Sequence, residues 1–208
     1  MNKKEDYLSE IKGIRKMIEE SSRFLSLSGL SGILIGVYAL TGAFLAYRVV
    51  YIPYSLHFRK TYANDALWQL AIIAAATLVL SLVTTLWLTH NKAKKAGVTT
   101  WNRGSKLMLI NLAIPLATGG ILSLIFLSRG IYTIISPAFL IFYGLALVNA
   151  AKYTRNEIFY IGIIQIILGL MAALMPGFGI IFWALGFGIV HIIYGILMYY
   201  RYEHITKE

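Results

Sequence analysis

The stretch Ile158–Tyr200 reads IFYIGIIQIILGLMAALMPGFGIIFWALGFGIVHIIYGILMYY and contains no Asp, Glu, Lys or Arg. Met175-Pro176-Gly177 divides it into two apolar segments, Ile158–Met175 and Phe178–Tyr200. Each segment approaches the roughly 20 residues that a helix needs to cross a bilayer. The Pro-Gly dipeptide is typical of a tight turn. The stretch therefore predicts two membrane-spanning helices that run antiparallel.

Four further uncharged segments of similar length precede this stretch: Phe24–Tyr47, Ala66–Thr89, Leu107–Ser128 and Gly130–Ala151. All nine acidic residues lie outside the six segments. A composition with 58% hydrophobic and 13% charged residues is typical of a membrane protein. We therefore expect an all-α membrane protein with a six-helix transmembrane domain over about residues 24–201. The six helices are expected to form three antiparallel hairpins.

The Lys and Arg residues are distributed unequally among the gaps between these segments. The gaps that share a side with the two termini hold fifteen of them, and the other gaps hold four. Cytoplasmic loops are enriched in Lys and Arg, so both termini are expected in the cytoplasm of a bacterium, with the protein in its inner membrane. Anionic lipids of the cytoplasmic face are the expected partners. No nucleic acid is expected, because no segment outside the spans is large enough for a nucleic-acid-binding fold.

The first 23 residues are charged and carry a short apolar stripe. Tyr7, Ile11, Ile14 and Ile18 recur at spacings of four, three and four residues, which predicts an amphipathic cytoplasmic helix over residues 1–23. Such a helix can lie in the headgroup region, or it can pair with a copy of itself or with a partner. Residues 202–208 are expected to form a cytoplasmic tail.

Small residues follow one face of the first span. They recur at alternating spacings of three and four residues: Gly29, Gly32, Gly36, Ala39, Ala43 and Ala46. Inside lipid, such a face lets a neighbouring helix backbone approach closely. The sequence therefore predicts a helix-packing face. Its partner is either another helix of the same chain or a second copy in a homo-oligomer.

The last two spans contain similar polar-centred segments, Gly162-Ile-Ile-Gln165-Ile-Ile-Leu-Gly169 and Gly188-Ile-Val-His191-Ile-Ile-Tyr-Gly195. In each one, a polar side chain shares a helical face with glycines three residues before and four residues after it. Counted from the cytoplasmic ends, the two polar residues differ in depth by roughly 3 Å. We expect Gln165 and His191 to face each other across a glycine-lined interface. Either they form a structural hydrogen bond, or His191 is a proton-sensitive switch.

Proline and glycine also occur within the third and fourth spans. Pro115 with Gly119-Gly120, and Ser136-Pro137, are expected to kink or interrupt their helices. Broken helices in corresponding positions can mark the site of a transporter. Proline kinks are also common in ordinary spans, because neighbouring groups satisfy the freed carbonyls. Both interpretations stay open.

The last two spans resemble a known family. A glycine-rich first helix, the Pro176-Gly177 turn and a second helix that reaches Tyr194-Gly195 are similar to the repeated hairpin of the HdeD family. The likeness is best over Gly162–Tyr200 and weaker over Gly120–Tyr143. The resemblance implies a six-span bacterial inner-membrane protein associated with acid resistance, and it carries no catalytic residues with it.

The sequence offers little for catalysis. It has no Cys, which excludes disulfides, thiolate metal sites and cysteine nucleophiles. The four histidines are expected at different depths, so no metal cluster is expected, and no carboxylate lies within the spans to act as a base or nucleophile. We therefore expect no enzyme activity, metal or cofactor. Three functions stay open: a protein that organises the membrane or responds to stress, a small channel or carrier for a neutral or lipophilic solute, and, as the weakest, an intramembrane enzyme.

Overall fold

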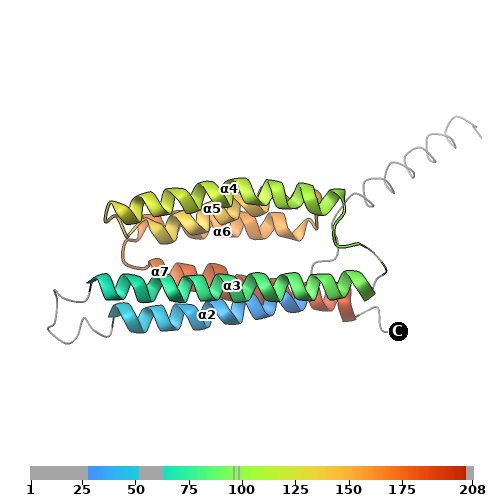
Figure 1. Ribbon diagram of the computed structural model, residues 1–208, viewed down its shortest axis with the longest axis horizontal. Helices are drawn as coiled ribbons and strands as arrows, with labels where there is room; N and C mark the ends of the chain where they lie inside the picture. The colour runs from blue at the N-terminus through green and yellow to red at the C-terminus, as the bar shows by residue number, and fades with distance from the viewer. Residues whose placement is uncertain (1–27, 52–62, 96, 98, 205–208) are drawn as a thin grey trace, which may run out of the picture.

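The computed structural model describes residues 28–51, 63–95, 97 and 99–204 (Figure 1). Within these ranges the chain is helical and contains no strand. Six helical segments are long and apolar enough to cross a membrane: Gly29–Val49, Ala66–Lys95, Arg103–Ser128, Ile135–Tyr153, Glu157–Leu174 and Gly179–Glu203. The prediction of an all-helical chain with six helices of this kind is confirmed. The predicted amphipathic helix over residues 1–23 lies outside the described residues.

The α-helices, in chain order, are α2 (Gly29–Tyr51), α3 (Ala63–Lys95), α4 (Arg103–Ser128), α5 (Ile135–Ala150), α6 (Glu157–Leu174), α7 (Gly179–Trp183) and α8 (His191–Tyr199). A 3₁₀ turn, η2 (Ala151–Tyr153), extends α5. The π-helical segments η3 (Ala184–Val190) and η4 (Tyr200–His204) join α7 to α8 and extend α8. The segments α7, η3, α8 and η4 are continuous, and we refer to them together, Gly179–His204, as the C-terminal helix. This helix includes residues 202–204, which were expected to belong to the tail.

Local sequence explains where α4 begins. The Asn102 side chain accepts a hydrogen bond from the Ser105 backbone N–H (2.8 Å), and the Ser105 hydroxyl accepts one from the Asn102 N–H (2.9 Å). This reciprocal capping box satisfies two of the free N–H groups at the helix start. Helix α4 therefore begins at Arg103, before the expected Leu107.

The start of α5 changes the interpretation of the proline in the fourth span. Gly130, where that span was expected to begin, lies in the turn after α4 with φ of 72°, a conformation that favours glycine. Helix α5 begins at Ile135, so Pro137 lies in its first turn. Proline is tolerated there, because the first N–H groups of a helix have no partner within the helix. The expectation that Pro137 interrupts this span is therefore wrong, whereas Pro115 does lie inside α4.

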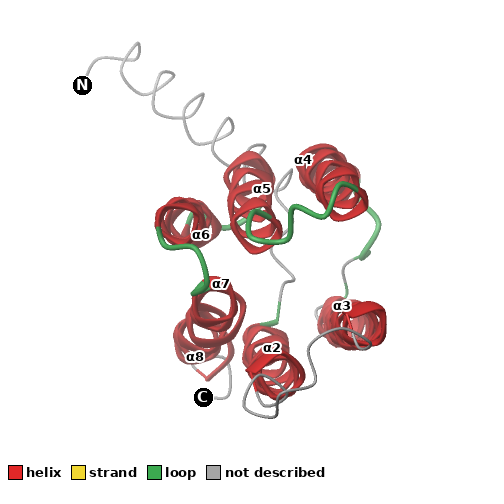
Figure 2. Ribbon diagram, turned by 90° about the vertical axis from the view of Figure 1, so that its left-hand side faces the viewer, coloured by secondary structure: helices red, strands yellow, loops and turns green. Residues whose placement is uncertain are grey.

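The helices form two groups. Helix α5 packs between α4 and α6, and we call these three the α5 group. Helix α2 packs between α3 and the C-terminal helix, and we call these three the α2 group. Figure 1 shows the groups as two layers, and Figure 2 shows the helices end-on. The groups meet mainly where α7 and η3 contact α5 and α6.

The small-residue face of the first span lies against the C-terminal helix of the same chain. A methyl group added at Gly29 would lie 2.7 Å from the Gly195 carbonyl oxygen, and one at Gly32 would lie 3.0 Å from the Gly195 Cα. Gly36 approaches the Gly188 carbonyl in the same way. Further along α2, Ala39 and Ala43 are buried and Ala46 is half-buried. Of the two partners left open by the sequence, these contacts are with a helix of the same chain.

Glycines also set the distance between α5 and α6. A methyl group at Gly144 would lie 2.6 Å from the Gly162 carbonyl oxygen, and one at Gly162 would lie 2.8 Å from the Gly144 carbonyl oxygen. Gly169 lies about two turns further along α6. It packs there against Leu140 and Ile141 of α5. Here the two backbones touch without intervening side chains, as in close helix crossings generally.

Basic residues gather at the end of the bundle where α2, α4 and α6 begin and where α3, α5 and the C-terminal helix end (Figure 1). We call this the basic end. Its described basic residues are Lys92, Lys94, Lys95, Arg103, Lys106, Lys152, Arg155 and Arg201. The described basic residues of the opposite end are Arg48 and Arg129. The asymmetry of the sequence is therefore also an asymmetry between the two ends of the folded bundle.

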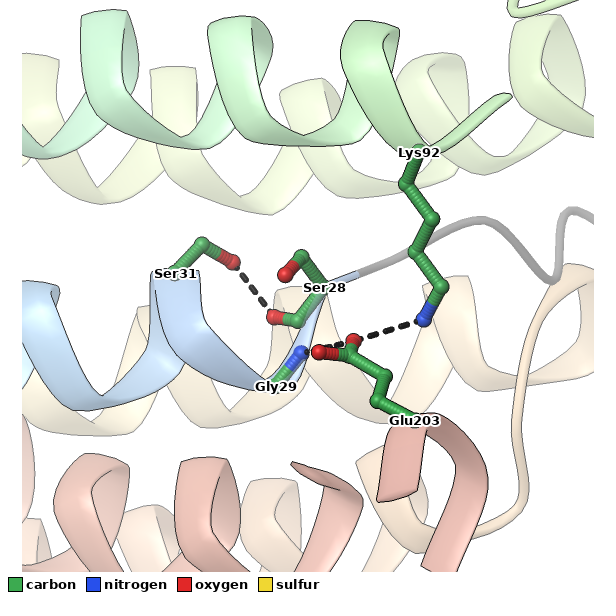
Figure 3. Close-up of polar contacts among 5 residues, drawn as sticks. All are labelled: Ser28, Gly29, Ser31, Lys92 and Glu203. Atoms are coloured by element: carbon green, nitrogen blue, oxygen red, sulfur yellow. Dashed lines mark hydrogen bonds and ion pairs between the residues drawn. The ribbon is translucent and has the colours of Figure 1, made fainter. Parts of the chain in front are cut away.

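One carboxylate ties three helices together at the basic end (Figure 3). Oε1 of Glu203 accepts hydrogen bonds from the Gly29 backbone N–H and from Nζ of Lys92, both at 2.7 Å. Negative charge at a helix N-terminus is favourable, because the first N–H groups of the helix point at it. Glu203 therefore links the end of the C-terminal helix to the start of α2 and the end of α3.

We expect the substitution Glu203→Gln to destabilise the protein by about 1 kcal/mol, because the amide keeps an acceptor for Gly29 but loses the charge that faces Lys92 and the helix N-terminus. Thermal unfolding in detergent measures the loss, which should shrink at high salt. A double-mutant cycle with Lys92→Gln isolates the ion pair. A coupling energy of zero in that cycle would contradict the role assigned to the pair.

Candidate functional site

His191 is buried and hydrogen-bonded through both ring nitrogens. Nε2 lies 2.7 Å from the Tyr143 hydroxyl on α5, and Nδ1 lies 3.0 Å from the Gly186 carbonyl oxygen in η3. A carbonyl oxygen can only accept, so Nδ1 carries the proton. In the neutral ring Nε2 then accepts from the Tyr143 hydroxyl. This pattern suits an uncharged imidazole with both nitrogens satisfied.

Gln165 on α6 reaches the same carbonyl. Its side chain is fully buried, and Nε2 donates to the Gly186 oxygen at 2.7 Å. The prediction that Gln165 and His191 face each other directly is corrected here, because the two side chains share the Gly186 oxygen as a common acceptor. Oε1 of Gln165 is buried without a hydrogen-bond partner in the described part of the chain. We call Tyr143, Gln165, Gly186 and His191 the polar cluster.

The backbone of η3 makes this arrangement possible. A side chain at Gly186 would overlap Oε1 of Gln165 and the Leu140 side chain. Gly186 also lies in a π-helical segment, a backbone form that often occurs at functional sites. The Phe187 ring next to it lies 5.0 Å from the Tyr143 ring and 6.1 Å from the His191 ring, centroid to centroid. Aromatic rings therefore cover one side of the polar cluster.

Sequence reasoning did not select Tyr143 as a site residue. In the sequence it marks only the end of the weaker likeness over Gly120–Tyr143. The useful signal was a hydroxyl in the middle of an uncharged segment, beside a glycine that permits close helix approach. A buried Tyr hydroxyl usually finds a hydrogen-bond partner, and here that partner is His191.

Among the described residues, the polar cluster is one of the polar links between the two helix groups. Toward the end opposite the basic end, the Ser136 hydroxyl donates to the Gly179 carbonyl at 2.6 Å. At the basic end, Glu157 accepts from Arg201 (3.0 Å) and from the Tyr202 hydroxyl (2.8 Å). The polar cluster lies between these two links. Hydrogen bonds therefore join α5 and α6 to the C-terminal helix at three levels along its length.

A groove runs between α6 and the C-terminal helix, with a volume of about 590 Å³. Most of its walls are apolar: Ile161, Ile164, Val190, Ile193, Leu197 and Met198. Glu157 and Arg201 line it at the basic end. Tyr194 also lines the groove, and its hydroxyl is buried without a hydrogen-bond partner among the described residues. This groove could not be predicted from the sequence, because it arises where two helices diverge.

Other polar residues of the expected spans have local partners. The Asn111 side chain donates to the Leu107 carbonyl of its own helix at 2.8 Å. Among residues 28–51, 63–95, 97 and 99–204, no three His, Asp or Glu side chains come together as a metal site. The described side chains offer hydrogen bonding in the polar cluster and an apolar groove.

No protein-family model, curated protein or solved structure matches this chain, so the comparisons neither support nor contradict the resemblance to the HdeD family.

Proposed function

We propose that this chain is a multi-pass integral protein of a bacterial inner membrane, with its helices inserted as antiparallel neighbours and both termini in the cytoplasm. Large apolar side chains are exposed on the outside of the bundle, among them Trp68, Ile72 and Leu86 on α3 and Ile114 and Leu124 on α4. Such surfaces are costly in water and suited to lipid. The basic end supports the orientation, because cytoplasmic loops are enriched in Lys and Arg.

Within that membrane, we propose that the protein binds and carries a lipophilic solute without enzymatic chemistry. The observation that carries this proposal is the groove between α6 and the C-terminal helix, which has apolar walls and a volume of about 590 Å³. Ligand sites are typically concave, mainly apolar and within this range of size. Of the functions that the sequence left open, a carrier of a neutral or lipophilic solute agrees best with such a groove.

The groove faces the outside of the bundle. On the C-terminal helix, Ile193 is 52% exposed and Leu197 is 62% exposed, and on α6 Ile164 is 43% exposed. In a bilayer these side chains would contact lipid, so a solute dissolved in the membrane could enter sideways without crossing water. Lateral entry suits a molecule with an apolar chain, because an ion or sugar without such a chain would not partition into the surrounding hydrocarbon.

Photo-crosslinking in vesicles tests this proposal. A neutral fatty alcohol with a diazirine on its chain is expected to label peptides of α6 and the C-terminal helix in preference to the other helices. Ile193→Trp, which fills the groove, should reduce this labelling several-fold. The matched control Ile121→Trp adds the same ring to an exposed site on α4, 61% exposed, and should leave labelling unchanged. Equal labelling of all helices, or equal effects of the two variants, would refute the proposal and favour the membrane-organising role.

A further inference from the structure

We propose that the ligand of this groove is an anionic phospholipid of the leaflet at the basic end, with its phosphate on Arg201 and an acyl chain between α6 and the C-terminal helix. This inference rests on the proposed function, because it names the class of molecule that the groove takes. The apolar walls of the groove would hold the acyl chain, and its charged end would hold the phosphate.

Arg201 is placed to receive a phosphate. It lines the groove, and its side chain is 68% exposed. One of its amino groups, Nη1, donates to Oε1 of Glu157 at 3.0 Å. A guanidinium has five N–H donors and can hold a phosphate through two parallel hydrogen bonds. The bond to Glu157 therefore orients the Arg201 side chain and leaves it donors for a ligand.

The charges at the mouth of the groove favour one negative charge. The guanidinium of Arg155 lies 3.5 Å from the centre of the Tyr202 ring, and the Tyr202 hydroxyl donates to Glu157. Arg201 lines the groove, and Arg155 lies outside it against Tyr202, so two guanidiniums stand near the single carboxylate of Glu157. That carboxylate already accepts hydrogen bonds from Arg201 and Tyr202. The two guanidiniums and the one carboxylate leave one net positive charge, which matches the single negative charge of a phosphodiester.

The apolar walls suit an acyl chain in length and direction. On the C-terminal helix they extend from Val190 to Met198, which at 1.5 Å per residue is roughly 12 Å. Arg201 follows directly at the basic end, where phospholipid headgroups lie in the orientation that we propose. A lipid with its phosphate at Arg201 would therefore run its chain along the groove toward the middle of the bundle.

Native mass spectrometry of the full-length protein tests the inference, with phosphatidylglycerol and phosphatidylcholine of identical acyl chains supplied in equal amounts. We expect the wild-type protein to retain phosphatidylglycerol in preference. Arg201→Gln should lower that retention about tenfold, to the level of phosphatidylcholine. Glu157→Gln should raise it, because a negative charge beside the phosphate is removed. An increase in binding cannot result from loss of folding, so this second variant separates headgroup recognition from stability.

The control is Arg103→Gln, which removes an exposed guanidinium at the same end but outside the groove. The headgroup assignment fails if this variant loses as much phosphatidylglycerol as Arg201→Gln, or if the wild-type protein shows no headgroup preference. It also fails if a second copy of the chain, detected as a dimer, occupies the groove. If both lipids are retained equally and Ile193→Trp releases both, the headgroup inference is wrong while the lipophilic-solute proposal stands.

Discussion

Replacing Gly195 by alanine is expected to lower the free energy of unfolding by about 3 kcal/mol, the upper end of the usual cost of overpacking. The added methyl group would lie 2.6 Å from the Gly29 carbonyl oxygen and 2.8 Å from the Gly32 carbonyl carbon. These are backbone atoms of α2, so no side chain can rotate away to make room. The C-terminal helix and α2 would have to separate along the whole crossing.

A matched substitution separates this effect from the general consequences of losing a glycine. Gly120 lies within α4, and a methyl group there would meet no atom within 4 Å. Gly120→Ala should leave stability unchanged or raise it, because alanine favours the helix by up to about 1 kcal/mol. Thermal unfolding of both variants in the same detergent makes the comparison. Equal stability of the two variants would show that α2 and the C-terminal helix do not approach as closely as described.

The second large effect is expected in the polar cluster, where two neighbouring polar residues should respond differently. His191→Leu would leave the buried Tyr143 hydroxyl without its acceptor, at a cost of about 1–3 kcal/mol. Gln165→Met should cost less than 1 kcal/mol, roughly the value of one net hydrogen bond. The reason is that Gly186 would keep the hydrogen bond from Nδ1 of His191, and the variant also removes an oxygen that has no partner in the described part of the chain.

The double variant Tyr143→Phe/His191→Leu tests whether the unpaired Tyr143 hydroxyl causes the loss of stability in His191→Leu. It removes donor and acceptor together, so it should be more stable than the sum of the two single losses predicts. Unfolding measurements on the three variants give the coupling. A larger loss from Gln165→Met than from His191→Leu would overturn this account of the polar cluster.

The hydrogen bond between His191 and Tyr143 also predicts whether acid raises or lowers the stability of the protein. A proton added to Nε2 of His191 would turn an acceptor into a donor that faces the Tyr143 hydroxyl. The hydroxyl could then accept, but its own proton would lose its partner. We therefore expect stability to fall as the pH is lowered into the range in which an exposed imidazole gains its proton, and His191→Gln to flatten the dependence. An unchanged pH profile would refute a proton-sensitive role for His191.

Much of the helical framework could be predicted, because charge and length constrain spans strongly. The segments without charges became helices, and the spacing of Gly29, Gly32 and Gly36 identified the face of α2 that contacts the C-terminal helix. Helix ends were less predictable. The capping box at Asn102 and the positive φ of Gly130 depend on local hydrogen bonds and turn geometry, which hydropathy does not report.

The site was predicted only in part. Spacing selected Gln165 and His191, but not Tyr143 or the Gly186 carbonyl at which they meet. Counting residues from the end of a span assumes a regular α-helical rise. It therefore does not predict a π-helical segment in which one backbone oxygen accepts hydrogen bonds from two side chains. The groove was also beyond sequence reasoning, since it depends on how far α6 diverges from the C-terminal helix.

The packing of α2 against the C-terminal helix has a consequence for biogenesis. Helix α2 is the first described helix to leave the ribosome, yet the helix that contains its contact residue Gly195 is the last. The α5 group consists of consecutive helices, so it can assemble while synthesis continues. The glycine face of α2 must wait for the end of the chain, and until then it is free to pair with the wrong helix. In a chain that ends before Gly179, this face would therefore stay open to other helices, whereas the contact between α5 and α6 would already be formed.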